Sequence, residues 1–208
     1  MEWLVLLAAA AGIWIYLAKR SPRTLDLSHL PERFVVFDLE TTGLNAFEHE
    51  IIEFGAIRVN RDSTSHDTFQ ALVKPSKKVP RKITQITGIT QEMIDSQGEP
   101  LDKVFQEFVE FIGELPLVAF NSEFDMAFLE RAAEPRGHKF RNRVSCALQM
   151  ARRAWPGRKS HRLADLAKDG GLDTGDAHRA IADCQSALIV YTAAANKLMT
   201  ANRPAKRH

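Results

Sequence analysis

Two carboxylates stand two residues apart inside an apolar run, which extends from Phe37 to Leu44 and reads Phe-Asp-Leu-Glu-Thr-Thr-Gly-Leu. Successive side chains of a β-strand point to opposite faces, so a strand here places Asp38 and Glu40 on one face. Ionised carboxylates that crowd together in a low dielectric repel each other unless a cation lies between them. The run therefore predicts half of a divalent-metal site.

An exposed strand is the alternative interpretation of these residues. In that arrangement Phe34, Val36 and Leu39 supply the buried contacts, and the two carboxylates face solvent. The hydroxyl-rich turn that follows, residues 41 to 43, favours the metal site, because α/β sheets bind ligands at the carboxyl ends of their strands. Further carboxylates downstream are needed to complete such a site.

Composition indicates a globular protein. The chain has 208 residues, 45% of them apolar and 26% charged, with a formal net charge of +2. These values are typical of one domain with a substantial core. Cys146 and Cys184 lack the spacing of metal ligands, so we expect a reducing compartment, with neither a zinc site nor a disulfide framework.

Basic residues are concentrated in one segment. Between Arg131 and Arg162 there are ten Lys or Arg residues and a single acid, Glu134. A basic surface beside an acidic metal site suits a polyanionic substrate such as nucleic acid. A solvated helix face with a charged loop is the alternative.

The N-terminus differs from the rest of the chain. Residues 3–18 form an uncharged, largely apolar run, and basic residues follow it at Lys19, Arg20 and Arg23. As a helix this run spans roughly 24 Å, somewhat less than a hydrocarbon core of about 30 Å. We expect an N-terminal apolar helix over residues 1–20 that anchors the chain on the cytoplasmic side of the cell membrane. An amphipathic or buried helix in a cytoplasmic protein is the alternative.

The remaining pattern predicts an α/β domain over residues 33–200, after a linker at 21–32 and before a basic tail at 201–208. Short connections between the first three apolar segments indicate an antiparallel meander, and a fourth strand then leads directly into a helix. We expect strands over 34–39, 51–59, 68–73 and 117–120, and helices over 90–94, over 101–112, from 121 and after 178.

Two further acids are candidate ligands. Asp125 lies at the start of the helix that follows the fourth strand, where Ser122 as N-cap and Asp125 at the third helical position resemble a capping box. Asp183 enters the C-terminal helix five residues after His178. Residues five apart on a helix differ by about 140°, so we expect His178 in the preceding loop or first turn, bending back over the cleft.

These segments together resemble the DEDDh family of 3′–5′ exonucleases, which includes the proofreading subunit of bacterial replicative DNA polymerase and ribonuclease T. The resemblance covers roughly residues 33 to 192 and is carried by three motifs in order. They are Asp38-Leu39-Glu40-Thr41-Thr42-Gly43, Asn121-Ser122-Glu123-Phe124-Asp125 and the segment from His178 to Asp183.

The resemblance implies a ribonuclease H-like fold with a mixed five-stranded sheet flanked by helices, and a phosphodiester hydrolase that binds two Mg²⁺ or Mn²⁺ ions. It implies that Asp38 bridges both ions, that Glu40 and Asp183 hold one of them, and that Asp125 supports the other. His178 would be the general base. The residues expected to bind the substrate are Thr41, Thr42, Gly43, Leu44, Asn121 and Phe124.

Three functions follow from these observations. The favoured one is an active exonuclease that releases nucleoside monophosphates from 3′ ends of single-stranded DNA, in proofreading or repair, or of RNA. The second is a non-catalytic nucleic-acid-binding module, and the third is a membrane-associated protein whose basic surface meets anionic lipid. The complete set of four acids and His178 favours the enzyme. Neither a polymerase partner nor an oligomeric state is specified.

Overall fold

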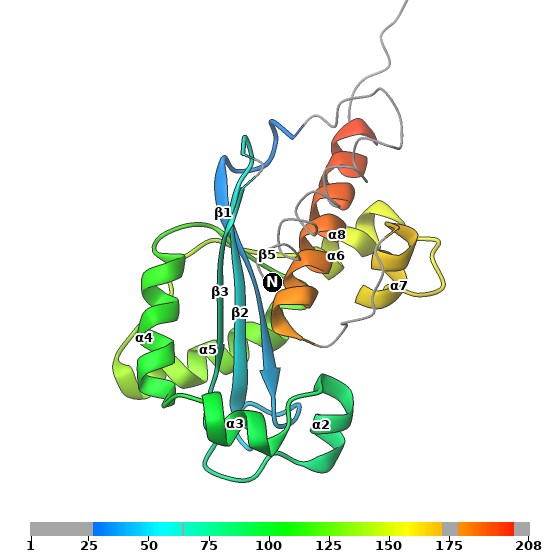
Figure 1. Ribbon diagram of the computed structural model, residues 1–208. Helices are drawn as coiled ribbons and strands as arrows, with labels where there is room; N and C mark the ends of the chain where they lie inside the picture. Colours follow the sequence, from blue (N-terminus) through cyan, green and yellow to red (C-terminus); the bar gives the residue numbers. More distant parts are fainter. Residues whose placement is uncertain (1–26, 64, 172–178, 202–208) are drawn as a thin grey trace, which may run out of the picture.

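The computed structural model describes residues 27–63, 65–171 and 179–201. Its centre is a five-stranded sheet in the order β3-β2-β1-β4-β5 (Figure 1). The first three strands are antiparallel neighbours, whereas β4 and β5 are parallel to β1, so the sheet is mixed. The strands are β1 (Arg33–Thr41), β2 (Ile51–Asn60), β3 (Asp67–Leu72), β4 (Leu117–Ala119) and β5 (Val144–Cys146).

Alternation along β1 divides the core between the two faces of the sheet. Val35, Phe37 and Leu39 belong to one buried cluster, and Phe34 and Val36 belong to the other. This period of two is the pattern of a strand that is covered on both faces. The even-numbered residues of β1 therefore face a different set of helices from the odd-numbered ones.

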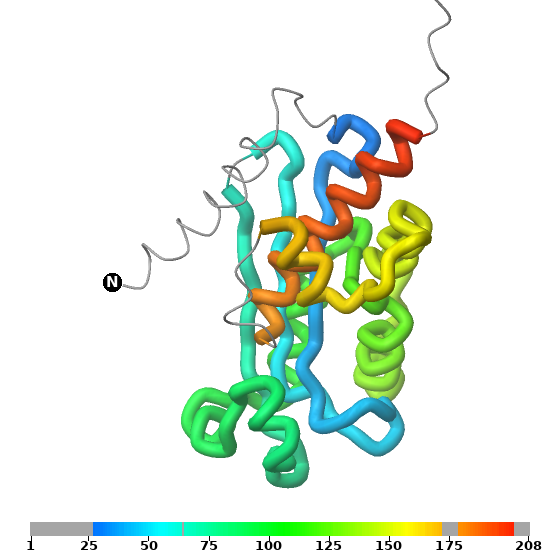
Figure 2. Tube along the Cα trace, turned by 90° about the vertical axis from the view of Figure 1, so that its right-hand side faces the viewer, coloured from blue at the N-terminus to red at the C-terminus, as the bar shows by residue number. Residues whose placement is uncertain are grey.

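Helices cover both faces (Figures 1 and 2). On the odd-numbered face lie α4 (Leu101–Ile112) and α5 (Ser122–Ala133), which ends in a short 3₁₀ turn, η1 (Glu134–Arg136). The even-numbered face packs against α6 (Ala147–Ala154), α7 (Leu163–Asp169) and the long α8 (Ala180–Ala201). Acids at even-numbered positions of β1 are thus directed toward α8.

A smaller cluster closes the end of the sheet where β1 runs out. It includes α2 (Arg81–Thr87) and α3 (Gln91–Gln97), and Ile94 of α3 and Ile89 of the connection between the two helices pack against Ile52. Figure 2 shows these two helices together at one end of the molecule. The Thr90 hydroxyl caps α3 by accepting a hydrogen bond from the Met93 N–H at 3.2 Å.

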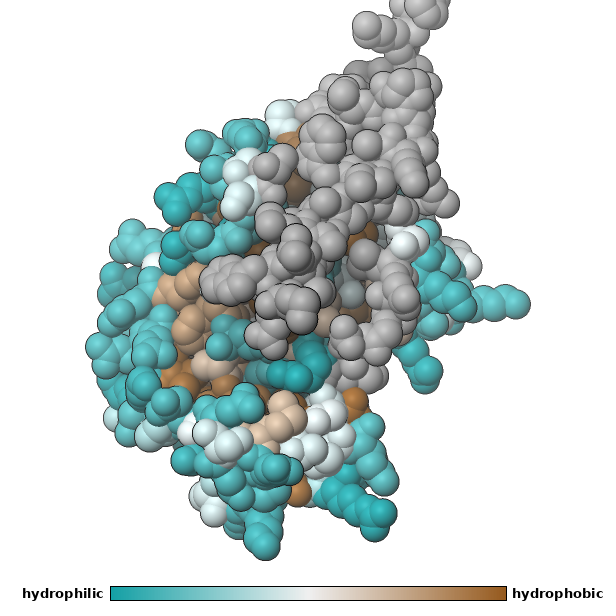
Figure 3. All heavy atoms as spheres, viewed as in Figure 1, coloured by the Kyte–Doolittle hydropathy of each residue, from teal (hydrophilic) through white to brown (hydrophobic). Residues whose placement is uncertain are grey.

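The edge strand β3 packs against α4 through aromatic side chains. Phe69 packs against Phe108 and Phe111 of α4, with ring centroids 5.9 and 5.6 Å apart. Figure 3 shows apolar surface where β3 meets α4, bordered by hydrophilic side chains. This packing attaches the edge strand β3 to the helices on the odd-numbered face of the sheet.

The antiparallel meander, the strand before α5 and the amphipathic helix at 101–112 are confirmed. The predicted N-terminal apolar helix and the basic tail fall on residues outside the described ranges. Within 27–63, 65–171 and 179–201, no helix has the length and apolar character needed to cross a bilayer.

Candidate active site

Three acids converge where β1 meets the first turn of α8. Asp38 and Glu40 lie on the even-numbered face of β1, and Asp183 projects from α8 as it crosses that face. One carboxylate oxygen from each residue can be chosen so that all three lie within 4.8 Å of one another. Such a separation lets a single cation contact all three oxygens. Because α8 covers the face of β1 that carries Asp38 and Glu40, the alternative of an exposed strand with two solvent-facing acids is wrong.

The fourth acid, Asp125, enters the same region from α5. Its side chain is 3% exposed, and its Oδ1 accepts a hydrogen bond from the backbone N–H of Leu39 at 3.3 Å. The predicted capping box is wrong, because α5 begins at Ser122, has Asn121 as its N-cap and makes no side-chain cap hydrogen bond. The carboxylate of Asp125 therefore reaches across to β1.

Burial and mutual repulsion oppose ionisation of these acids. Burial, followed by the nearby Asp125 and Asp183 carboxylates, raises the pKa of Asp38 well above its usual range. The pKa of Glu40 is raised to about 8, chiefly by burial and then by Asp183. Burial likewise raises the pKa of Asp125 to about 7, although its backbone hydrogen bonds act in the opposite direction.

This donor set fits divalent cations. A cation held among the carboxylates would favour their ionised forms and so offset the cost that the raised pKa values express. Carboxylate oxygens are hard ligands, which Mg²⁺ and Mn²⁺ prefer over nitrogen or sulfur. The residues that could hold metal are therefore Asp38, Glu40, Asp125 and Asp183.

The turn after β1 is held by its own hydroxyl groups. The Thr41 hydroxyl donates to the carbonyl of Gly43 at 2.6 Å, and the Thr42 hydroxyl accepts from the Glu50 N–H at 2.9 Å. Both threonines are buried, whereas the side chain of Leu44 is 86% exposed. A β-carbon at Gly43 would lie 2.4 Å from the ring of His49, so a larger residue there would require the His49 side chain to move. The turn thus presents Leu44 to solvent beside the acids.

The other predicted substrate residues lie at the start of α5. Asn121 is exposed as the N-cap. Phe124 is half-buried, with its ring centroid 5.0 Å from that of Phe128, and it packs on the core of the odd-numbered face. Packing against this core accounts for the half-buried position of Phe124.

His178 belongs to the segment 172–178, which lies outside the described residues. The next residue, Arg179, is described, and α8 begins at Ala180. The assignment of His178 as general base therefore stays a prediction from sequence.

The basic segment from Arg131 to Arg162 contains α6 and the loops on either side of it. Arg131, Arg136 and Arg158 form ion pairs with Glu134, Asp102 and Asp169, respectively. The other seven basic residues of the segment are exposed, and none has an acidic partner within ion-pair distance in the described part of the chain. They are Lys139, Arg141, Arg143, Arg152, Arg153, Lys159 and Arg162. These cations can meet a polyanion without first breaking a salt bridge.

A further acid, Glu53, lies beside the site and is not among the residues predicted from the sequence. Glu53 of β2 is fully buried, and its charge helps to raise the pKa values of both Asp38 and Glu40. It interrupts the apolar run of residues 51 to 59, and this interruption is the signal by which it could have been found.

Comparison with known sequences connects this geometry to an enzyme family. Residues 35–191 match the protein family described as Exonuclease. DNA polymerase III subunit epsilon of Aquifex aeolicus is 37% identical over 169 residues, which cover 79% of this chain and 82% of that protein. The PolC-type DNA polymerase III of Clostridium perfringens is 34% identical over 178 residues, but these cover 12% of the polymerase.

Solved structures share the fold. The nuclease domain of 3′hExo, a DEDDh family member bound to rAMP, has a TM-score of 0.66 at 19% identity, covering 84% of this chain and 94% of that one. The zinc-bound complex of E. coli exonuclease I with single-stranded DNA has a TM-score of 0.68 at 20% identity, covering 82% of this chain and 41% of that one. The mixed sheet with its helices is thus the ribonuclease H-like fold expected from the sequence.

Proposed function

The chain belongs to the exonuclease family and is a 3′–5′ exonuclease of the DEDDh type, and from that premise we propose that it releases nucleoside monophosphates from the 3′ end of single-stranded DNA. The observation that carries this proposal is the convergence of Asp38, Glu40 and Asp183 within 4.8 Å, with Asp125 held beside them. No acid of the set is replaced by a neutral residue, which argues against a non-catalytic binding module.

The proposed metal ligands divide between two cations. Asp38 would contribute to both cation sites, Glu40 and Asp183 would hold one cation, and Asp125 would support the other. When bound, two divalent ions would neutralise the negative charge that develops on the phosphodiester during in-line hydrolysis. Burial of the acids excludes competing water and strengthens their hold on these ions.

His178 takes the proton from the attacking water. A histidine is suited to this task because its usual pKa lies near neutrality, and general-base catalysis typically contributes about 10²- to 10⁴-fold to the rate. Replacing His178 with alanine should cost a factor in this range while leaving Mn²⁺ binding unchanged. Equal activity of the H178A variant would remove the histidine from the mechanism.

The substrate end is received by the turn after β1. Leu44 contacts the terminal base, and Thr41, Thr42 and Gly43 shape the backbone that lies beside the sugar. Asn121 and Phe124 border the same site from α5. The seven exposed cations between Lys139 and Arg162 attract the phosphates further along the strand. Single-stranded DNA in the E. coli exonuclease I complex supports this choice of substrate, whereas rAMP in the 3′hExo structure supports RNA as the alternative.

A substrate panel tests the proposal. The full chain is incubated with 3′-labelled single-stranded DNA and RNA of the same sequence, in Mg²⁺, in Mn²⁺ and in chelator. We expect metal-dependent release of labelled monophosphate, faster from DNA. Release from RNA alone would assign the exoribonuclease alternative, and no release from either substrate would refute the activity.

We also propose that residues 3–18 anchor the domain to the cytoplasmic face of a membrane. Support comes from the uncharged run and the basic residues that follow it. Cell fractionation of the full chain and of a version without residues 1–26 tests this proposal. The full chain should sediment with membranes after a high-salt wash, and equal amounts of both in the soluble fraction would refute it.

A further inference from the structure

Glu53 lies on the same face of the sheet as the acids of the site. In the antiparallel pairing of β1 and β2, Glu53 is the partner of Glu40, and Gly55 is the partner of Asp38. Directly paired residues of neighbouring strands project to the same face. Glu53 is therefore directed toward α8, and no part of its surface is exposed.

The Glu53 carboxylate accepts hydrogen bonds from Arg179, from the first residue of α8 and from β3. Arg179 donates from Nη2 at 2.7 Å and from Nε at 3.2 Å, and the backbone N–H of Ala180 donates at 3.0 Å. From β3, the Gln70 side chain donates at 2.9 Å. A buried carboxylate is tolerated when it is paired and hydrogen-bonded in this way. Its strongest contacts are made with the start of α8.

The first turn of α8 is also packed tightly on β2. A β-carbon at Gly55 would lie 2.5 Å from the backbone carbon of Ala180, and the thiol of Cys184 donates to the Gly55 carbonyl at 3.3 Å. The absence of a side chain at Gly55 thus permits α8 to approach β2 closely. The hydrogen bonds of Glu53 and Cys184 hold the two elements together on either side of this contact. Strand β2 fixes the turn at both of its ends.

That turn carries Asp183, one of the three acids that converge at the site. The backbone N–H of Asp183 donates to the carbonyl of Arg179 at 3.0 Å, so Asp183 is one helical turn from the residue that Glu53 holds. A displacement of Arg179 and Ala180 would move the Asp183 carboxylate relative to Asp38. Metal sites need their ligands within a few tenths of an ångström of the required geometry.

We propose that Glu53 is a positioning residue for the metal site, acting through Arg179 and Ala180 on the placement of Asp183. The inference rests on the proposed metal-dependent function. A negative charge suits this position because it forms an ion pair with the Arg179 guanidinium at 2.7 Å and so holds the residue before α8 against β2. Glutamine at position 53 would keep the shape of the side chain and lose the ion pair.

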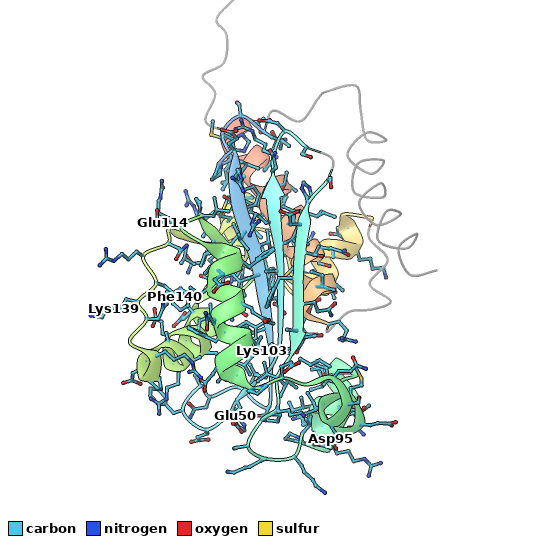
Figure 4. The ribbon with its side chains drawn as sticks, turned by 60° about the vertical axis from the view of Figure 1, so that its left-hand side comes forward. Glu50, Asp95, Lys103, Glu114, Lys139 and Phe140 are labelled. Carbon is cyan, nitrogen blue, oxygen red and sulfur yellow. The ribbon has the colours of Figure 1, made fainter. Side chains whose placement is uncertain are left out.

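Metal binding without nucleic acid is the direct readout. Mn²⁺ is titrated into the full-length wild type, E53Q and E99Q, and affinity is measured by calorimetry and by the electron paramagnetic resonance signal of free Mn²⁺. Glu99 is the matched control, because it forms an ion pair with Lys103 at 3.1 Å on the opposite face of the sheet, where Figure 4 labels Lys103. Loss of a partner that orients a metal ligand typically weakens affinity by about 10- to 100-fold.

We expect E53Q to bind Mn²⁺ at least tenfold more weakly and E99Q to bind within twofold of wild type. Saturating Mn²⁺ should restore most of the E53Q turnover, which a merely unfolded protein would not show. R179K, which keeps a positive charge at this position, should bind Mn²⁺ more tightly than R179Q. This pair of variants tests the positioning role independently if E53Q does not fold.

Two results separate the inference from its premise. Wild-type affinity in E53Q, or equal affinities of R179K and R179Q, would overturn the positioning role while leaving the metal-dependent nuclease intact. Absence of Mn²⁺ binding by the wild type would instead refute the proposed function.

Discussion

The backbone N–H of Leu39 donates a hydrogen bond to Oδ1 of Asp125, which lies 3.3 Å away and 86 residues further along the chain. Strand β4 pairs with β1 only at Val35 and Val36, so β1 continues past the pairing of its parallel neighbour. The first turn of α5 occupies the place that a longer β4 would have filled, and Asp125 takes the Leu39 amide as its partner. One hydrogen bond thus places Asp125 beside the acids of β1.

Replacing Asp38 with alanine should separate catalysis from folding. Turnover should fall by at least about 10³-fold, because the ligand proposed to contact both cations supplies several kcal/mol of transition-state stabilisation. Thermal stability in chelator should be unchanged or increased, since the substitution removes an acid whose pKa is raised first by burial and then by the neighbouring acids. D95A, at an acid on α3 that Figure 4 labels, is the control and should retain wild-type turnover. Unfolding of D38A would instead assign Asp38 a structural role.

The metal-free protein should lose stability as pH rises. Folding raises the pKa of Glu40 from 4.5 to about 8 and that of Asp125 from 3.8 to about 7. The folded state therefore binds more protons than the unfolded state between these values, and the free energy of unfolding falls with increasing pH in that window. Thermal melts in chelator from pH 5 to pH 8.5 should show a decline of several degrees, and Mn²⁺ should reduce it. A melting temperature that rises with pH would contradict the raised pKa values.

Site residues whose position follows from a local strand or helix pattern could be predicted from the sequence. Contacts that depend on how distant segments pair in the fold could not. Asp38 and Glu40 could be placed on one face from the period of a strand, and Asp183 from its entry into a helix. The capping box at Ser122 was wrong because the Leu39 amide offers Asp125 a tertiary partner, which sequence spacing does not reveal. Glu53 was missed for the same reason, since its place opposite Glu40 follows from the pairing of β1 with β2.

Short elements also escaped prediction. Strand β5 has three residues, and α7 has seven, too few to show a clear period. Both exist because larger elements supply their partners: β5 pairs with β4, and Leu166 of α7 packs with α8 in the even-numbered core. Tertiary contacts, rather than intrinsic preference, form these segments.

Leu44 should affect substrate binding without affecting the fold. Its side chain is 86% exposed, so the L44A substitution should leave the melting temperature within about 1 °C of wild type. Loss of an apolar contact worth about 1 kcal/mol should raise KM roughly fivefold for single-stranded DNA. M199A, which alters another exposed apolar residue at the far end of α8, is the control for surface hydrophobicity. An unchanged KM in L44A would exclude contact with the terminal base.

Gly55 should be essential for the approach of α8 to the sheet. An added β-carbon would lie 2.5 Å from the Ala180 backbone, and helix backbone cannot give way as a flexible side chain does. We expect G55A to lower the free energy of unfolding by about 1–3 kcal/mol, the usual cost of overpacking, and to weaken Mn²⁺ binding as Asp183 moves away from Asp38. G157A is the matched control, because a β-carbon at Gly157 meets no atom within 4 Å. Chemical denaturation and Mn²⁺ titration of both variants make the comparison, and wild-type stability with wild-type affinity in G55A would show that α8 is not held by this close contact.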